Sequence, residues 1–104
     1  MQSTQQSVII HFQYGLDTLD SLHDLENELE TILEFAKVGF YDGNEINVNL
    51  NDGYMFMYGS DAEKIYEVIF PIIKLFPFMN NATVTLHYEL PIGGTKEKVF
   101  SISF

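Results

Sequence analysis

The hydrophobic residues of this chain recur with a period of two, then of three or four, then of two again, and this alternation limits the folds open to it. A period of two indicates a half-buried strand, and a period near 3.6 indicates a helix with one apolar stripe. The pattern predicts strands over residues 7–14, 46–50, 54–58, 82–90 and 99–104, and helices over residues 19–37 and 61–76. The predicted order is therefore β-α-β-β-α-β-β.

The first six of these elements have the order of the split βαβ, or ferredoxin-like, motif. Right-handed crossovers place both helices on one face of an antiparallel sheet. We therefore predict an α+β fold with a ferredoxin-like βαββαβ core and an added C-terminal strand. The expected strand order is 4-1-3-2, with the fifth strand outside the fourth. At 104 residues the chain has room for one domain, which we expect over residues 7–104 after a flexible tail at residues 1–6.

Punctuating residues predict where the helices begin and end. Asp17 or Thr18 can cap the first helix, and Gly39 can end it. The S-x-x-E run that starts at Ser60 has the form of a capping box for the second helix. Pro71 lies inside the second helical pattern. We expect it to kink or interrupt that helix, because proline removes one backbone hydrogen bond.

Two Asp-Gly pairs predict turns on either side of strand 46–50. The first, Asp42-Gly43, lies in a loop expected over residues 40–45. The second, Asp52-Gly53, follows another polar residue and is a strong hairpin signal.

Strand 54–58 (YMFMY) is apolar on both faces, which is typical of a central strand. Either Met55 and Met57 face the helices, or Tyr54, Phe56 and Tyr58 do. Both orientations leave apolar side chains on the open sheet face, where an antiparallel sheet does not need them. Such a patch favours a protein contact or a homodimer through this face or an edge strand. The alternative is that the chain's own tail or final hairpin covers it.

The chain is strongly acidic. Fifteen acidic residues stand against five lysines and no arginine, a formal net charge of −10. Nucleic acid and anionic lipid would repel such a protein. No K/R-rich RNA-binding motif accompanies the aromatic strand, and no run approaches the roughly 20 apolar residues of a membrane span. We expect a cytoplasmic protein with no nucleic-acid or membrane partner, since the N-terminus does not resemble a signal peptide.

The negative charge is concentrated on the first helix. Successive carboxylates four residues apart repel one another by roughly 0.2–0.5 kcal/mol per pair, which lysines between them would relieve. One interpretation is a solvated acidic face. The other is a docking surface for a basic protein. The candidate partner-binding residues are Asp20, Asp24, Glu28, Glu30 and Glu34.

The open sheet face offers a second candidate site, for a small molecule. Strands 7–14 and 82–90 are expected to be neighbours, so His11 and His87 could share a patch with Glu89 and Tyr58. Two imidazoles and a carboxylate can hold catalytic zinc, but the metal-ligand spacing H-x-x-x-H is missing. The alternative is a solvated polar face. We predict no catalytic residue, no metal and no cofactor.

Several short motifs resemble a group of small bacterial proteins. These proteins have an acidic first helix, a D-G-x-E turn, here Asp42 to Glu45, and a Y-G-x-D-A helix start, here Tyr58 to Ala62. The resemblance covers about two-thirds of the chain. It implies the fold and a bacterial origin, and it transfers no activity and no site residue.

These observations favour a non-enzymatic protein-interaction domain. A concrete form is an immunity-type or inhibitor protein whose acidic helix blocks a basic toxin or nuclease. The alternatives are a small-molecule binder or enzyme that uses the open sheet face, and an accessory domain that serves a neighbouring protein.

Overall fold

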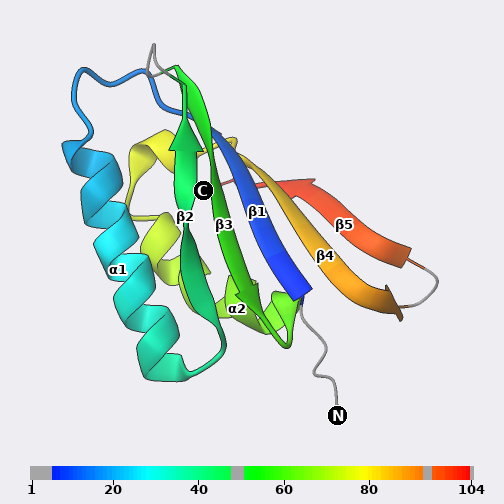
Figure 1. Cartoon of the computed structure of the whole chain (residues 1–104). Coiled ribbons are helices and arrows are strands. Elements are labelled where there is room, and N and C mark those ends of the chain that lie inside the picture. Colours follow the sequence, from blue (N-terminus) through cyan, green and yellow to red (C-terminus); the bar gives the residue numbers. More distant parts are fainter. Residues whose placement is uncertain (1–5, 48–50, 93–94, 104) are drawn as a thin grey trace.

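The computed structural model describes residues 6–47, 51–92 and 95–103, with the backbone alone at residues 89–92 and 95. The elements, shown in Figure 1, are β1 (Gln6–Gln13), α1 (Asp20–Ala36), β2 (Phe40–Ile46), β3 (Asp52–Gly59), α2 (Ala62–Ile73), a short 3-10 helix (Pro77–Met79), β4 (Thr83–Ile92) and β5 (Thr95–Ser101). This order confirms the predicted β-α-β-β-α-β-β sequence of elements.

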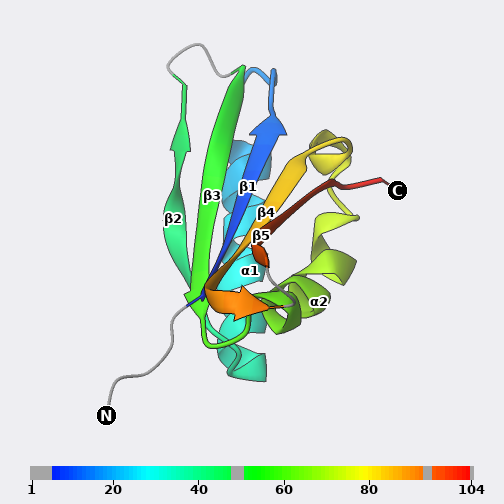
Figure 2. The same ribbon diagram turned by 90° about the vertical axis from the view of Figure 1, so that its right-hand side faces the viewer.

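The strands form one sheet in the order β2-β3-β1-β4-β5, and each neighbouring pair is antiparallel. Both helices lie on the same side of this sheet, as Figures 1 and 2 show from two directions. The α+β ferredoxin-like prediction with an added strand outside β4 is confirmed.

The core lies between the sheet and the two helices. Alternate residues of β1 face it, and Val8, Ile10 and Phe12 are fully buried. The apolar stripe of α1 meets them with Leu22, Leu25, Leu29 and Leu33, and α2 contributes Ile65, Ile69 and Ile73. Met55 and Met57 are also fully buried, so β3 turns its methionines to the helices and its aromatic residues to the open face.

The strand β2 begins six residues earlier than predicted. Its pairing with β3 shifts register between Tyr41 and Gly43, where Gly43 has a φ of 112°. The Asp-Gly pair is therefore part of a β-bulge and not of a turn, because a bulge also uses glycine at positive φ. Of the predicted strand 46–50, positions 48–50 lie outside the described residues.

The second Asp-Gly pair is not a turn either. Asp52 and Gly53 belong to β3, where Gly53 pairs with Ile46 on one side and Phe12 on the other. The connection from β2 comes earlier in the chain, and the N–H of Asn47 donates to the carbonyl of Asp52 over 3.0 Å. The Asp52-Gly53 pair therefore lies after the turn that it predicts, because pairing with β1 extends β3 toward that turn.

The helix α1 ends at Ala36, three residues before the predicted glycine. Its C-cap is Lys37 in the left-handed conformation, with its N–H bonded to the carbonyl of Leu33. Gly39 serves a different purpose, since a Cβ there would lie 2.3 Å from the carbonyl oxygen of Tyr58. At the other end the N-cap is Leu19, and the Thr18 hydroxyl accepts from the N–H of Asp20 at 3.3 Å.

The helix α2 departs from its prediction in two ways. Its N-cap is Asp61, whose carboxylate accepts from the N–H of Lys64, so Ser60 does not form the predicted capping box. The helix also continues through Pro71 to Ile73, so the proline does not interrupt it, one of the two effects expected of it. Glu67 and Pro71 are both exposed, so the carbonyl that loses its donor can be hydrated.

The last two strands are longer than predicted. β4 reaches Ile92 and β5 begins at Thr95, whereas the sequence pattern ends the first of these strands at residue 90 and begins the second at residue 99. Ile102 follows β5 and is buried, and its N–H bonds to the carbonyl of Ala82. Phe104, the last residue of the predicted strand 99–104, lies outside the described residues.

Candidate functional site

The helix α1 exposes its carboxylates along the side that faces away from the core. The ion pairs found among the described residues involve Asp52, Glu67 and Glu97 and none of the carboxylates of α1. Four of the five lysines lie elsewhere, at α2, its C-cap and β5. The predicted partner-binding residues are all exposed: Asp20, Asp24, Glu28, Glu30 and Glu34.

One carboxylate of α1 has a structural task. Glu26 is half-buried and accepts hydrogen bonds from the Tyr41 hydroxyl, at 2.7 Å, and from the Asn44 amide, so it ties α1 to β2. Burial, followed by the hydrogen bond to Glu26, raises the pKa of Tyr41 far above its ordinary value. Tyr41 is therefore an uncharged hydrogen-bond donor, and Glu26 is an acceptor that stabilises the fold.

The seam between α1 and β2 is hollowed in two places. The first hollow, of about 350 Å³, includes His23, Glu30 and Asp42 in its lining. The second, of about 320 Å³, lies toward the C-terminal end of α1 and includes Glu30, Glu34 and Phe40. Because Glu30 lines both, the acidic surface has depressions in which a cationic side chain could be held by more than one carboxylate.

An exposed aromatic residue lies within this acidic surface. Phe35 is 82% exposed and falls outside the buried stripe of α1. Phe40, at the start of β2, is 51% exposed. Phe35 is not among the candidate residues predicted from the sequence. The available signal was its position off the leucine repeat, since a large apolar residue on the polar side of a helix is typical of a contact surface.

The open sheet face carries a stack of aromatic side chains on β3 and its neighbours. Tyr54 is stacked on the His11 ring with 4.5 Å between ring centroids, and it lies 6.3 Å from Phe56. Tyr58 contacts Phe40 with 5.7 Å between centroids. The apolar patch expected on this face is therefore half-exposed rings running along β3.

The register separates the two histidines of the alternative ligand site. His11 lies opposite Thr83, whereas His87 lies opposite Ser7, four residues away along β1. At about 3.3 Å per residue the two positions are roughly 13 Å apart. Tyr58 is also opposite Ser7 and so lies in the row of His87, not in that of His11. The side chain of Glu89 lies outside the described residues.

Each histidine instead has an acidic neighbour of its own. His11 Nε2 lies 2.8 Å from the carboxylate of Asp52, and His87 Nδ1 lies 3.4 Å from that of Glu97. The hydrogen bond from His11, with a second from Asn47, lowers the pKa of Asp52. Among the side chains that the structure describes, no three from His, Asp or Glu gather to hold a metal ion.

Two further observations bear on the class of protein. No helix in the described ranges is long and apolar enough to cross a membrane. Comparisons with protein-family models, with curated protein sequences and with solved structures find no match for this chain.

Proposed function

We propose that this domain binds a basic protein through the exposed carboxylates of α1. The observation that carries the proposal is that five exposed carboxylates lie on one helix, and no described residue pairs with any of them. Their mutual repulsion opposes folding. A cationic partner would offset that repulsion, because its positive charges would attract the carboxylates.

The surroundings of α1 support a specific contact and not only a diffuse charge. The hollows beside Glu30 suit lysine or arginine side chains, and Phe35 supplies an aromatic anchor. Interfaces commonly combine a few aromatic anchors, which dominate affinity, with charges that accelerate association. The role we assign is that of an immunity-type or inhibitor protein, which covers the cationic surface of a toxin or nuclease.

The experiment compares two triple variants with the same change in net charge. The first carries Asp24→Asn, Glu28→Gln and Glu34→Gln on α1. The second carries Glu45→Gln, Glu67→Gln and Glu97→Gln elsewhere, at residues that are also exposed. A basic partner captured from a lysate of the source organism is purified, and its Kd is measured for each form. We expect the α1 variant to bind about 30-fold more weakly or worse, and the control to change less than threefold.

Phe35→Ala separates a specific interface from attraction between opposite charges. We expect the purified partner to lose about tenfold in affinity, whereas poly-lysine should bind the wild type and Phe35→Ala equally. Equal weakening by both triple variants would count against a docking surface on α1, because it would trace binding to net charge alone.

A further inference from the structure

The two helices do not cover the whole sheet. Helices about 10 Å wide cover roughly 20 Å side by side, whereas five strands at about 4.8 Å span roughly 24 Å. α1 packs against β2, and α2 packs against β1, β3 and β4. A strip beside α2 is therefore left open on the helix side of the sheet, and a groove of about 480 Å³ lies there.

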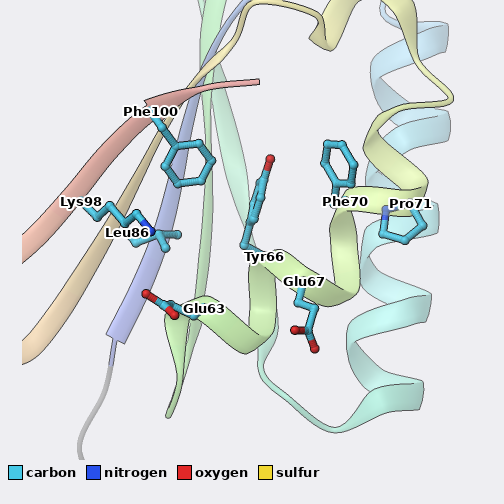
Figure 3. Close-up of a pocket in the computed structure, with 8 residues that line it drawn as sticks. All are labelled: Glu63, Tyr66, Glu67, Phe70, Pro71, Leu86, Lys98 and Phe100. Atoms are coloured by element: carbon cyan, nitrogen blue, oxygen red, sulfur yellow. The ribbon is translucent and has the colours of Figure 1, made fainter. Parts of the chain in front are cut away.

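Figure 3 shows how aromatic side chains line this groove. Tyr66 projects between Phe100 of β5 and Phe70 of α2, with ring centroids 5.0 and 5.8 Å away. Leu86 of β4 and Pro71 of α2 complete the apolar surface. The volume and the apolar lining match those of sites for small organic molecules, which usually measure about 300–1,000 Å³.

Two glutamates of α2, one helical turn apart, are among the residues that line the groove. Glu63 accepts a hydrogen bond from the Tyr88 hydroxyl at 2.8 Å, which holds its carboxylate in place. Glu67 lies 3.5 Å from Lys64, but both side chains are mostly exposed, so this pair contributes little. The carboxylate of Glu67 is therefore accessible to a ligand.

Pro71 leaves one backbone acceptor of α2 without its usual helical donor. Proline has no N–H, so the carbonyl of Glu67, four residues earlier, receives no hydrogen bond from position 71. Both residues line the groove. The carboxylate and the carbonyl of Glu67 are therefore two hydrogen-bond acceptors on one residue of the lining.

The charge of the lining selects for a cation. Two carboxylates stand against one ammonium group, that of Lys98, whose Nζ lies 6.0 Å from the centroid of the Phe100 ring. An anionic ligand would have one cation to bind and two carboxylates, Glu63 and Glu67, to avoid. A ligand with a protonated amine would satisfy the carboxylate and the carbonyl together.

We propose that this groove binds a small organic molecule in which an aromatic ring is joined to a protonated amine. The ring packs among Tyr66, Phe70 and Phe100, and the amine donates to the carboxylate and the carbonyl of Glu67. This site is separate from the proposed docking surface on α1 and lies on the opposite side of the sheet from the histidines of the open face.

Three probes with the same ring test both parts of the proposal in the intact chain. Phenethylamine is cationic, phenethyl alcohol is neutral and hydrocinnamate is anionic. Each is titrated while the backbone amide signals of the protein are followed by NMR. We expect phenethylamine to bind with a Kd on the order of 1 mM, as suits so few atoms. Its shifts should be confined to residues 63–71, 86 and 98–100. The alcohol should bind roughly fivefold more weakly, and the acid weaker still.

A matched pair of variants assigns the amine contact. Glu67→Gln should weaken phenethylamine roughly fivefold and leave phenethyl alcohol unchanged, whereas Glu28→Gln, the same charge change on α1, should alter neither. Both positions are exposed, so both variants should fold. The proposal is overturned if phenethylamine shifts mainly the signals of α1, if all three probes bind alike, or if no signal moves at 10 mM, about ten times the expected Kd.

Discussion

The two sides of the helical layer are built alike and end differently. On one side α1 is tied to β2 by the Tyr41 hydroxyl, which donates to Glu26. On the other side α2 is tied to β4 by the Tyr88 hydroxyl, which donates to Glu63. Beside α1 the sheet stops at β2, but beside α2 it continues with β5. The first side is therefore a polar seam whose hollows are lined by carboxylates, and the second is a larger groove lined by aromatic rings.

This difference shows that an added edge strand creates a surface as well as extending a sheet. The rings of Tyr66 and Phe100 would be core residues if a third helix covered β5. With two helices they stay half-exposed. The carboxylates of α1, by contrast, lie on a helix whose leucine stripe is already buried in the core. The same layer thus presents a polar surface at one edge and an apolar surface at the other.

The largest expected effect on stability is on the α1 side, where the helix packs its leucines into the core. Leu29 is fully buried between α1 and the sheet. Leu29→Ala should lower the free energy of unfolding by about 3 kcal/mol, because the transfer term and the cavity term add. Phe35→Ala, also on α1, should change it by less than about 0.5 kcal/mol. Urea denaturation measures both, and equal losses would show that Phe35 packs against the chain.

A smaller loss is expected at the groove. Phe100 is only partly buried, so Phe100→Ala should cost about 1–2 kcal/mol, less than the roughly 3–5 kcal/mol of a fully buried phenylalanine. The same urea titration compares it with Leu29→Ala. If the two variants lost the same stability, the groove would be closed in solution and the contrast between the two sides would fail.

The hydrogen bond on the α1 side should be worth less again. Tyr41→Phe removes the donor to Glu26 and should cost about 1 kcal/mol. Tyr54→Phe, on the open face, makes the same chemical change at a residue whose side chain is exposed, and little change is expected there. Chemical denaturation of both variants at neutral pH provides the measurement. If Tyr41→Phe left the free energy of unfolding unchanged, Asn44 alone would hold Glu26.

The smallest effect is on the α2 side, in the way that the free energy of unfolding falls as the pH rises above 9. Burial, followed by the hydrogen bond to Glu63, raises the pKa of Tyr88 to about 12. The unfolded chain ionises this tyrosine near pH 10, so its contribution is complete below pH 10 and is lost as the pH rises toward 12. Tyr88→Phe should therefore lose less stability than the wild type between pH 9 and 11. Parallel profiles from urea denaturation would contradict the assignment.

Local signals in the sequence were right about the kind of element and less reliable about its limits. The Asp42-Gly43 pair predicts a turn, but the positive φ of Gly43 serves a bulge within β2. Gly39 was expected to end a helix, yet it lies where the start of β2 meets the end of β3 and leaves no room for a Cβ. Bulges, turns and close approaches all select glycine, so residue type alone does not distinguish them.

The candidate sites divide in the same way. The exposure of the acidic residues of α1 follows from its leucine repeat, because the helix period places them opposite the buried stripe. The distance between His11 and His87 depends on the register of β1 against β4, which no local pattern encodes. The groove could not be anticipated either, since its lining comes from α2, β4 and β5 together.

The sequence by itself determined the order of the elements, the buried stripe of each helix, the sheet topology and the acidic character of α1. These follow from periodicity, the handedness of crossovers and charge, all of which act along the chain. The tertiary structure alone decided which side of β3 is buried, where the strands end, and that α2 leaves β5 uncovered. Those outcomes depend on packing and strand register between residues far apart in the chain.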